Sequence, residues 1–178
     1  MKIAIIGAHG TGKSTYSYGL IYYLKKKTLN AGLLKNLMDE YYPNISEESI
    51  TSEGQLKVIS KQEIKERELG KKVDHLVCDG SVIESYIYLA SKFGRNLTIE
   101  PQVDDLARTY DCVFKFPINP QYFTNSLYMD KRFQQRIDSI IDRYLKDKNI
   151  AYHQAPLINP DAFMLKILGP ILDKAPKF

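Results

Sequence analysis

Hydrophobic and polar positions along the chain form two alternating patterns, short apolar runs and longer segments with a helical period. The apolar runs suit buried strands, and they lie at 2–6, 33–38, 75–79, 111–116 and 149–153. Helical periodicity predicts helices at 15–27, 46–73, 82–93, 101–110, 129–147 and 159–173. Strands that alternate with helices in this way predict an α/β fold built on a parallel sheet.

A glycine-rich turn joins the first strand to the first helix, and it reads Gly7-Ala8-His9-Gly10-Thr11-Gly12-Lys13-Ser14. The spacing G-x-x-x-x-G-K-[ST] between a strand and a helix is that of a phosphate-binding loop. Backbone N–H groups of such a loop converge on one concavity, and the helix adds its positive end. We therefore expect a nucleotide to be bound by Gly7, His9, Gly10, Thr11, Gly12, Lys13, Ser14 and Thr15.

Two side chains of the loop and one distant acid have predicted roles in the chemistry. Lys13 would reach the β- and γ-phosphates, and the hydroxyl of Ser14 would bind Mg²⁺. Asp79 ends the strand at 75–79, a place from which an acid can join the Mg²⁺ shell. His9 fills a variable loop position, and we expect it near the phosphates without a role as a base.

Asp39 and Glu40 follow the second apolar run, at the carboxyl end of a predicted strand. Ligands of open α/β sheets bind outside these strand ends, which makes both acids candidates for contact with an acceptor. The alternative is a polar turn before Pro43.

Gln62 and Glu66 lie inside the apolar stripe of the helix predicted at 46–73. Polar groups in such a stripe need partners, so they either cap neighbouring structure or hydrogen-bond a bound molecule. We take substrate binding as the working prediction for both.

Arg132 and Arg136 open the strongly periodic helix at 129–147, beside its apolar stripe. Two guanidinium groups placed in this way can clamp a phosphoryl group during transfer. The alternative is surface ion pairing with Asp138 and Asp142, but these acids project from another face of the helix.

Composition narrows the class of protein. The 178 residues are 44% hydrophobic and 26% charged, which is typical of one globular domain. A net charge of +4 suits an anionic ligand and does not require nucleic acid. No apolar run is long enough to span a membrane, and the first strand leaves no room for a signal peptide. We expect a cytoplasmic protein whose two cysteines are reduced.

With these residues in view, the chain resembles the small P-loop kinases, namely ribosylnicotinamide kinase domains and, more distantly, deoxynucleoside and thymidylate kinases. The resemblance runs through the phosphate loop, Glu40, Gln62, Glu66, Cys78-Asp79-Gly80-Ser81, Tyr110-Asp111-Cys112-Val113-Phe114, Arg132 and Arg136. It implies a three-layer P-loop NTPase fold, with a five-stranded parallel sheet of order 2-3-1-4-5 and helices on both faces. It also implies a lid at about 118–136 that carries both arginines, and an acceptor near Glu40, Gln62 and Glu66.

The chain departs from this pattern in two places. Relatives often have arginine after the acid of the third strand, where this chain has Gly80, and shortly after the acid of the second, where Tyr41-Tyr42-Pro43 follows Glu40. Both arginines commonly steady the acceptor or its phosphate, so their absence favours a hydroxyl acceptor over a monophosphate. Glu40 or Asp39 would then be the base. Lys61 and Arg95 remain candidate replacements for the lost anchor.

The sequence therefore predicts a Mg²⁺-dependent enzyme that moves the γ-phosphate of ATP to a nucleoside, a nucleotide or a related small acceptor. One alternative is a kinase that acts on a modified base in DNA, and another is a regulatory NTPase. A guanine-specifying N-K-x-D motif does not follow the fourth strand, which argues against a GTPase. The sequence leaves open whether the protein forms a homodimer or binds nucleic acid.

Overall fold

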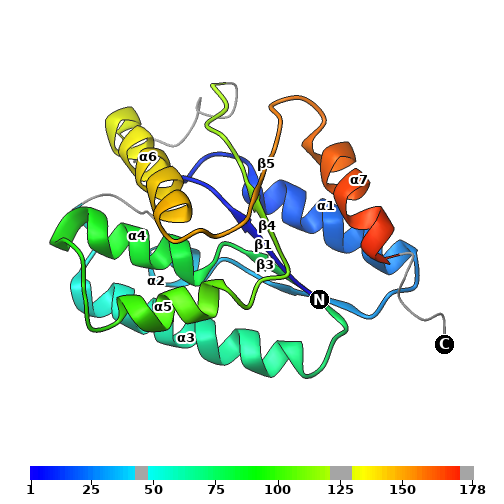
Figure 1. Ribbon diagram of the computed structural model, residues 1–178, viewed down its shortest axis with the longest axis horizontal. Coiled ribbons are helices and arrows are strands. Elements are labelled where there is room, and N and C mark those ends of the chain that lie inside the picture. The colour runs from blue at the N-terminus through cyan, green and yellow to red at the C-terminus, as the bar shows by residue number, and fades with distance from the viewer. Residues whose placement is uncertain (43–47, 121–129, 173–178) are drawn as a thin grey trace.

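The computed structural model describes residues 1–42, 48–120 and 130–172, and it has a central sheet between two layers of helices (Figure 1). The strands are β1 (Lys2–Ile6), β2 (Ala31–Leu34), β3 (His75–Asp79), β4 (Cys112–Lys115) and β5 (His153–Gln154). The helices are α1 (Lys13–Lys26), α2 (Met38–Tyr41), α3 (Ser52–Gly70), α4 (Val82–Phe93), α5 (Glu100–Ala107), α6 (Lys131–Asp147) and α7 (Pro160–Leu172).

The five strands form one sheet in the order β2-β3-β1-β4-β5, and every pair is parallel. This confirms the predicted topology. The register places Ile5 beside Asp79 of β3, and Ile6 beside Lys115 of β4. The carboxyl ends of β1, β3 and β4 therefore meet at one edge, from which the phosphate loop leads into α1.

Successive residues of the central strands face opposite layers, as the pleat of a strand requires. Ile3 and Ile5 of β1 pack with Leu20 and Leu24 of α1 in one buried cluster, which also takes in α7. Ala4 and Ile6 belong to the other cluster, with apolar side chains of α3, α4, α5 and α6. Figure 1 shows this division, with α1 and α7 together on one side of the sheet. The predicted three-layer arrangement is confirmed.

The segment between β2 and α3 differs most from the prediction. The second strand ends at Leu34, and the apolar run ends in a short helix, α2, for which Leu37 is the N-cap and Met38 the first residue. The side chain of Asn36 accepts a hydrogen bond from the backbone N–H of Met38 and so supports the first turn. Asp39 and Glu40 consequently lie on a helical turn and not directly at a strand end.

The third helix begins later than the sequence predicts. Thr51 caps α3, and its side chain accepts a hydrogen bond from the backbone N–H of Gly54. Residues 48–51 precede the helix, and 46–47 lie outside the described part of the chain. The predicted fifth strand at 149–153 is also wrong in its bounds, because only His153 and Gln154 pair with β4.

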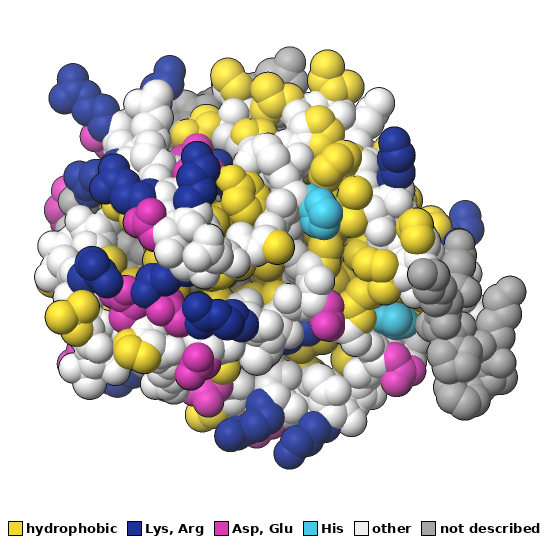
Figure 2. Space-filling view, in the orientation of Figure 1, with side chains coloured by type: hydrophobic (Ala, Val, Ile, Leu, Met, Phe, Trp, Pro, Cys, Tyr) yellow, Lys and Arg dark blue, Asp and Glu magenta, His cyan; other side chains and the backbone are white. Residues whose placement is uncertain are grey.

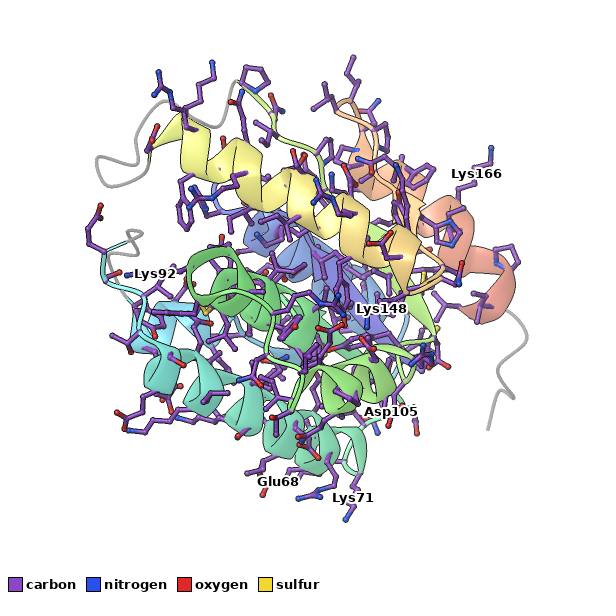
Figure 3. All side chains as sticks on the ribbon, turned by 60° about the vertical axis from the view of Figure 1, so that its left-hand side comes forward. Glu68, Lys71, Lys92, Asp105, Lys148 and Lys166 are labelled. Carbon is purple, nitrogen blue, oxygen red and sulfur yellow. The ribbon has the colours of Figure 1, made fainter. Side chains whose placement is uncertain are left out.

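Buried polar groups join the helices of the larger layer. Lys148, at the end of α6, donates hydrogen bonds to Glu100 and Asp104 of α5 (Figure 3). Glu100 also accepts from Tyr86 of α4, so three helices share one polar network.

Of the predicted lid, 121–129 lie outside the described residues. Helix α6 begins after Asp130, whose side chain accepts from the N–H of Arg132. Within the described ranges, no helix is both long and apolar enough to cross a bilayer.

Candidate active site

The phosphate loop takes a conformation that depends on its glycines. Gly10 and Gly12 have φ angles of 70° and 84°, in the left-handed region that glycine adopts at little cost. A Cβ atom on Gly7 would lie 2.6 Å from the backbone oxygen of Phe116, which a real side chain does not tolerate. The hydroxyl of Thr11 donates to the carbonyl of Ala8 at 2.9 Å and closes the turn. The loop predicted from its spacing is therefore formed.

Lys13 is buried and is held by groups of the protein itself. Its Nζ donates to the carbonyl oxygens of Gly7 and Ala8, each at 2.8 Å. Glu84 Oε1 lies 3.3 Å from the same nitrogen and also accepts, at 3.4 Å, from the backbone N–H of Gly7. Burial raises the pKa of Glu84 to about 7, although Lys13 acts in the opposite direction.

Glu84 was missing from the predicted site. The sequence signal was its position one turn before Tyr88 on α4, a helix that begins directly after the acid of β3. Nothing in that pattern showed that this face of the helix meets the phosphate loop.

His9 is fixed between two elements of the larger layer. Its imidazole Nδ1 lies 2.9 Å from the hydroxyl of Tyr88, and its ring stacks on Phe133 with 5.5 Å between centroids. Gln134 of α6 donates to the carbonyl of His9 at 2.7 Å. Burial, and then the charge of Lys13, lower the pKa of His9 to about 3. His9 is thus neutral near pH 7 and connects the loop to α6.

An open cleft of about 750 Å³ lies beside the loop. Ser14 and Asp79 both line it, as the Mg²⁺ prediction requires. Asp79 is buried, and its Oδ1 has no hydrogen-bond partner among the described residues. An unpaired carboxylate oxygen near a hydroxyl fits Mg²⁺, which prefers oxygen ligands and usually binds one or two carboxylates together with phosphates and water.

A closed metal cage is not part of this site. Within 1–42, 48–120 and 130–172, no group of three or more His, Cys, Asp or Glu side chains is placed to hold an ion. A metal at Ser14 and Asp79 would therefore depend on the phosphates of a nucleotide for its remaining ligands.

A second, smaller cavity of about 50 Å³ adjoins the cleft, and Asn36 and Asp39 line both. Its walls are His9, Lys13, Asn36, Met38, Asp39, Gln62, Ser81, Glu84, Ser85 and Tyr88. This set brings together the phosphate loop, α2, α3 and α4. An acceptor placed here would meet the γ-phosphate held by Lys13.

The two neighbouring acids of α2 have different surroundings. Desolvation and then the nearby Asp79 raise the pKa of Asp39, with Lys13 acting against them. Glu40 is exposed and pairs with Lys61 and Lys65 of α3, and its hydrogen bond to Lys61 is the main cause of its lowered pKa. Asp39 therefore lies where the two cavities meet. Glu40 lies at the rim of the open cleft, where Lys61 and Lys65 balance its negative charge.

Gln62 and Glu66 of α3 also have different surroundings. Gln62 lines the small cavity, and its amide donates to Glu66 Oε1 at 2.7 Å. The carboxylate of Glu66 also accepts from the hydroxyl of Tyr110 and from Lys2. Glu66 thus has protein partners on both oxygens, which supports the alternative of a capping role, while Gln62 keeps its place at the candidate acceptor site.

The arginines of α6 lie on its exposed surface, beside the phosphate loop. Arg136 lies over the ring of Phe133, 5.1 Å from its centroid, and Phe133 contacts His9 in turn. Asp138 and Asp142 instead pair with the buried Lys115 at 2.8 and 3.1 Å. The two acids considered as partners of the arginines are therefore engaged by Lys115.

Arg95 does not replace the missing phosphate anchor. Its guanidinium donates to both oxygens of Glu100, at 2.6 and 3.0 Å, beyond the far end of α4. This overturns its candidacy. Lys61 is engaged by Glu40.

The fold and the loop define a P-loop nucleotide-binding protein with the sheet order of the small kinases. A family model described as an AAA domain matches residues 2–159, and the chain belongs to that family. No curated protein matches the chain in a direct comparison.

Three solved structures share the fold. A deoxyadenosine kinase from M. mycoides has a TM-score of 0.65 and 15% identity, covering 97% of this chain and 99% of its own. A thymidylate kinase from Ehrlichia chaffeensis has a TM-score of 0.67 and 19% identity, with coverages of 94% and 98%. NadR in complex with NR has a TM-score of 0.74 and 14% identity over 99% of this chain, which spans 53% of the NadR chain. The resemblance to P-loop nucleoside and nucleotide kinases is thereby confirmed at the level of the fold.

Proposed function

We propose that the protein is an ATP-dependent kinase that transfers the γ-phosphoryl group to a small acceptor of the nucleoside or nucleotide type. The observation that carries this proposal is the small cavity beside Lys13, which is lined by the phosphate loop and by Asp39. A site for an acceptor next to a triphosphate site distinguishes a transferase from a simple NTP-binding module. We place the activity in the cytoplasm, where ATP and Mg²⁺ are available.

Each group of the loop has a defined part in this mechanism. Lys13 would leave the carbonyls of Gly7 and Ala8 and bind the β- and γ-phosphates, together with the N–H groups of the loop. Ser14 and Asp79 would hold Mg²⁺, which neutralises charge on the phosphates when bound. Arg132 and Arg136 would close from α6 over the transferring group, where charge develops in the transition state.

We assign the orientation of the acceptor to Asp39, supported by Gln62. Asp39 reaches both cavities, and its raised pKa makes it a better proton acceptor than an ordinary aspartate. Glu40, the acid that the sequence favoured, would instead hold Lys61 and Lys65 at the rim of the cleft.

The test is ADP release measured with ATP, Mg²⁺ and a panel of nucleosides and nucleoside monophosphates. We expect acceptor-dependent turnover, and we expect Lys13→Ala to lose at least about 100-fold in kcat because the charge on the phosphates is no longer stabilised. Lys57→Ala is the matched control, since Lys57 is exposed and pairs with Glu53 one turn away on α3. Calorimetry with Mg·ATP checks donor binding separately. Binding without turnover on any acceptor would reject the kinase and leave a regulatory NTPase.

The same panel addresses the DNA-directed alternative when a duplex is included as an acceptor. On the face shown in Figure 2, acidic and basic side chains are interspersed, and this face presents no continuous basic surface to a phosphate backbone. The net charge of +4 does not require a nucleic acid either, and we propose a small acceptor over a polymer.

A further inference from the structure

We propose that the acceptor presents a neutral hydroxyl to the γ-phosphate, and that the small cavity beside Lys13 rejects phosphate monoesters. This inference rests on the proposed kinase function and names the chemical class of its acceptor. Three features of the described residues carry it: the charge of the cavity, its unpaired polar atoms, and the positions of the neighbouring cations.

The charge of the cavity is unfavourable for a second phosphate. Asp39 and Glu84 both line it, and Asp79 lies close enough to raise the pKa of each. Lys13 is the one basic residue among its described lining residues, and the donor phosphates require that lysine. A phosphate monoester in this cavity would face two carboxylates without a cation of its own, which is how binding sites exclude a wrong ligand.

Unpaired polar atoms of the residues that line the cavity match hydroxyl groups. His9 Nε2, Ser81 Oγ and Glu84 Oε2 are buried, and none has a hydrogen-bond partner among the described residues. An ionised Glu84 carboxylate can only accept, whereas the Ser81 hydroxyl can donate or accept, and so can a ring nitrogen of a neutral imidazole, according to its tautomer. An acceptor hydroxyl group both donates and accepts, whereas an ionised phosphate only accepts and leaves Glu84 unpaired.

The position of the cavity fits a reacting hydroxyl group. It has a volume of about 50 Å³ and lies between Lys13 and Asp39, where the end of an acceptor would meet the γ-phosphate. The remainder of the acceptor would extend past Asn36 and Asp39 into the open cleft.

The cations considered as anchors for an acceptor phosphate have acidic partners or are disfavoured by the backbone. Gly80 has a φ of 86°, and a Cβ atom there would lie 3.2 Å from Glu84 Oε2, so a side chain is strained and crowded at the position where relatives often carry arginine. Lys61 and Lys65 pair with Glu40, and Arg95 pairs with Glu100. Lys35 lines only the open cleft. The sequence at 43–47 and 121–129 contains no lysine or arginine that could serve instead.

The reaction then balances as a single displacement. The acceptor oxygen forms a bond to the γ-phosphorus as the bond from that phosphorus to the β,γ-bridging oxygen breaks. The electron pair leaves with ADP, and the hydroxyl proton passes to Asp39. A monophosphate acceptor would need no such base, because its oxygen is already ionised.

The experiment compares nucleosides with their own 5′-monophosphates at pH 8, with ATP and Mg²⁺, by release of ADP. We expect kcat/KM to be at least about tenfold higher for the nucleoside of the preferred pair. Equal or higher values for the monophosphates would overturn the inference and leave the kinase intact. If neither series supports turnover, the proposed function fails, and the inference fails with it.

A variant tests whether the buried charge causes the discrimination. Glu84→Gln keeps the shape of the side chain and removes its charge, so the ratio of nucleoside to monophosphate kcat/KM should fall at least about threefold. Glu53→Gln, which alters an exposed acid of α3, is the control and should leave the ratio unchanged. An unchanged ratio in Glu84→Gln would overturn the electrostatic basis of the inference. Circular dichroism and calorimetry with Mg·ATP establish that the variant is folded and binds its donor.

Discussion

Glu84 Oε1 lies 3.3 Å from Lys13 Nζ and accepts from the backbone N–H of Gly7 at 3.4 Å. These two donors are the ones that a phosphate loop offers to a polyphosphate. A carboxylate of α4 uses them in this structure, so the ATP of the proposed function would exchange one anionic partner of Lys13 for another. Glu84 lines the small cavity, and its second oxygen is buried without a protein partner among the described residues.

The buried Glu84 makes stability depend on pH. Its folded-state pKa is about 7, against 4.5 for an ordinary glutamate, so the folded chain keeps a proton between these values that the unfolded chain loses. Stability therefore falls as the pH rises from 4.5 to 7, and the loss is complete above pH 7. We expect Glu84→Gln to be more stable than wild type by about 1–3 kcal/mol at pH 8, and no more stable at pH 4.5. Urea unfolding at the two pH values measures the difference, and equal effects at both would contradict the prediction.

His9 has the opposite dependence. Its pKa of about 3 in the folded chain lies below the ordinary 6.5, so the unfolded chain takes up a proton first as the pH falls. Its contribution to stability is present above pH 6.5 and is lost toward pH 3. At pH 5, we expect the slope of unfolding free energy against pH to be shallower in His9→Gln by about 1.4 kcal/mol per pH unit. His153→Gln, at an exposed position of β5, is the control and should keep the wild-type slope.

We expect substitutions of Asp39 and Glu40 to affect activity to different extents, because only Asp39 lines the small cavity. We expect Asp39→Asn to lower kcat by about 100-fold or more, the usual size of general-base catalysis, with little change in the KM for ATP. Glu40→Gln should stay within about threefold of wild type, since it alters an exposed pair with Lys61 and Lys65. The raised pKa of Asp39 places the acid limb of the pH–rate profile above the usual aspartate range. That limb should disappear in Asp39→Asn. If kcat instead fell more in Glu40→Gln than in Asp39→Asn, Glu40 would be the base, as the sequence suggested.

Lys115 holds α6 to the sheet. It is buried at the end of β4 and pairs with Asp138 and Asp142 of the helix that carries both candidate lid arginines. Lys115→Met leaves two carboxylates without their cation, and we expect a loss of about 3 kcal/mol in unfolding free energy. Lys146→Met, at an exposed position of α6, is the control. Adding Asp138→Asn to Lys115→Met should recover part of the loss, and no recovery would show that the pair does not stabilise the helix.

The sheet and the loop could be predicted because local signals fixed them. The apolar run at 75–79 and the amphipathic segment at 82–93 match β3 and α4 at both ends, since polar or glycine residues bound each. The strand predicted at 33–38 was too long at its carboxyl end. Leu37 and Met38 are buried, but they belong to the start of a helical turn and not to a strand. Apolar residues at adjacent positions do not distinguish these two cases.

The sequence could not predict which polar side chains line the candidate site. Asp39 and Glu40 are neighbours, and only the rotation of α2 decides which of them faces the cavity. Gln62 and Glu66 share a face of α3, yet Tyr110 and Lys2, which are distant in sequence, engage the second residue and not the first. Such pairings depend on how helices and strands pack against one another. The spacing of residues along one helix does not reveal that packing.

The left-handed backbone at Gly80 also bears on how this chain could change during evolution. A side chain at that position would meet both an unfavourable φ and the oxygen of Glu84. A descendant that placed arginine there would carry the strain of the turn after β3, and we expect such a change to come together with a substitution at Glu84.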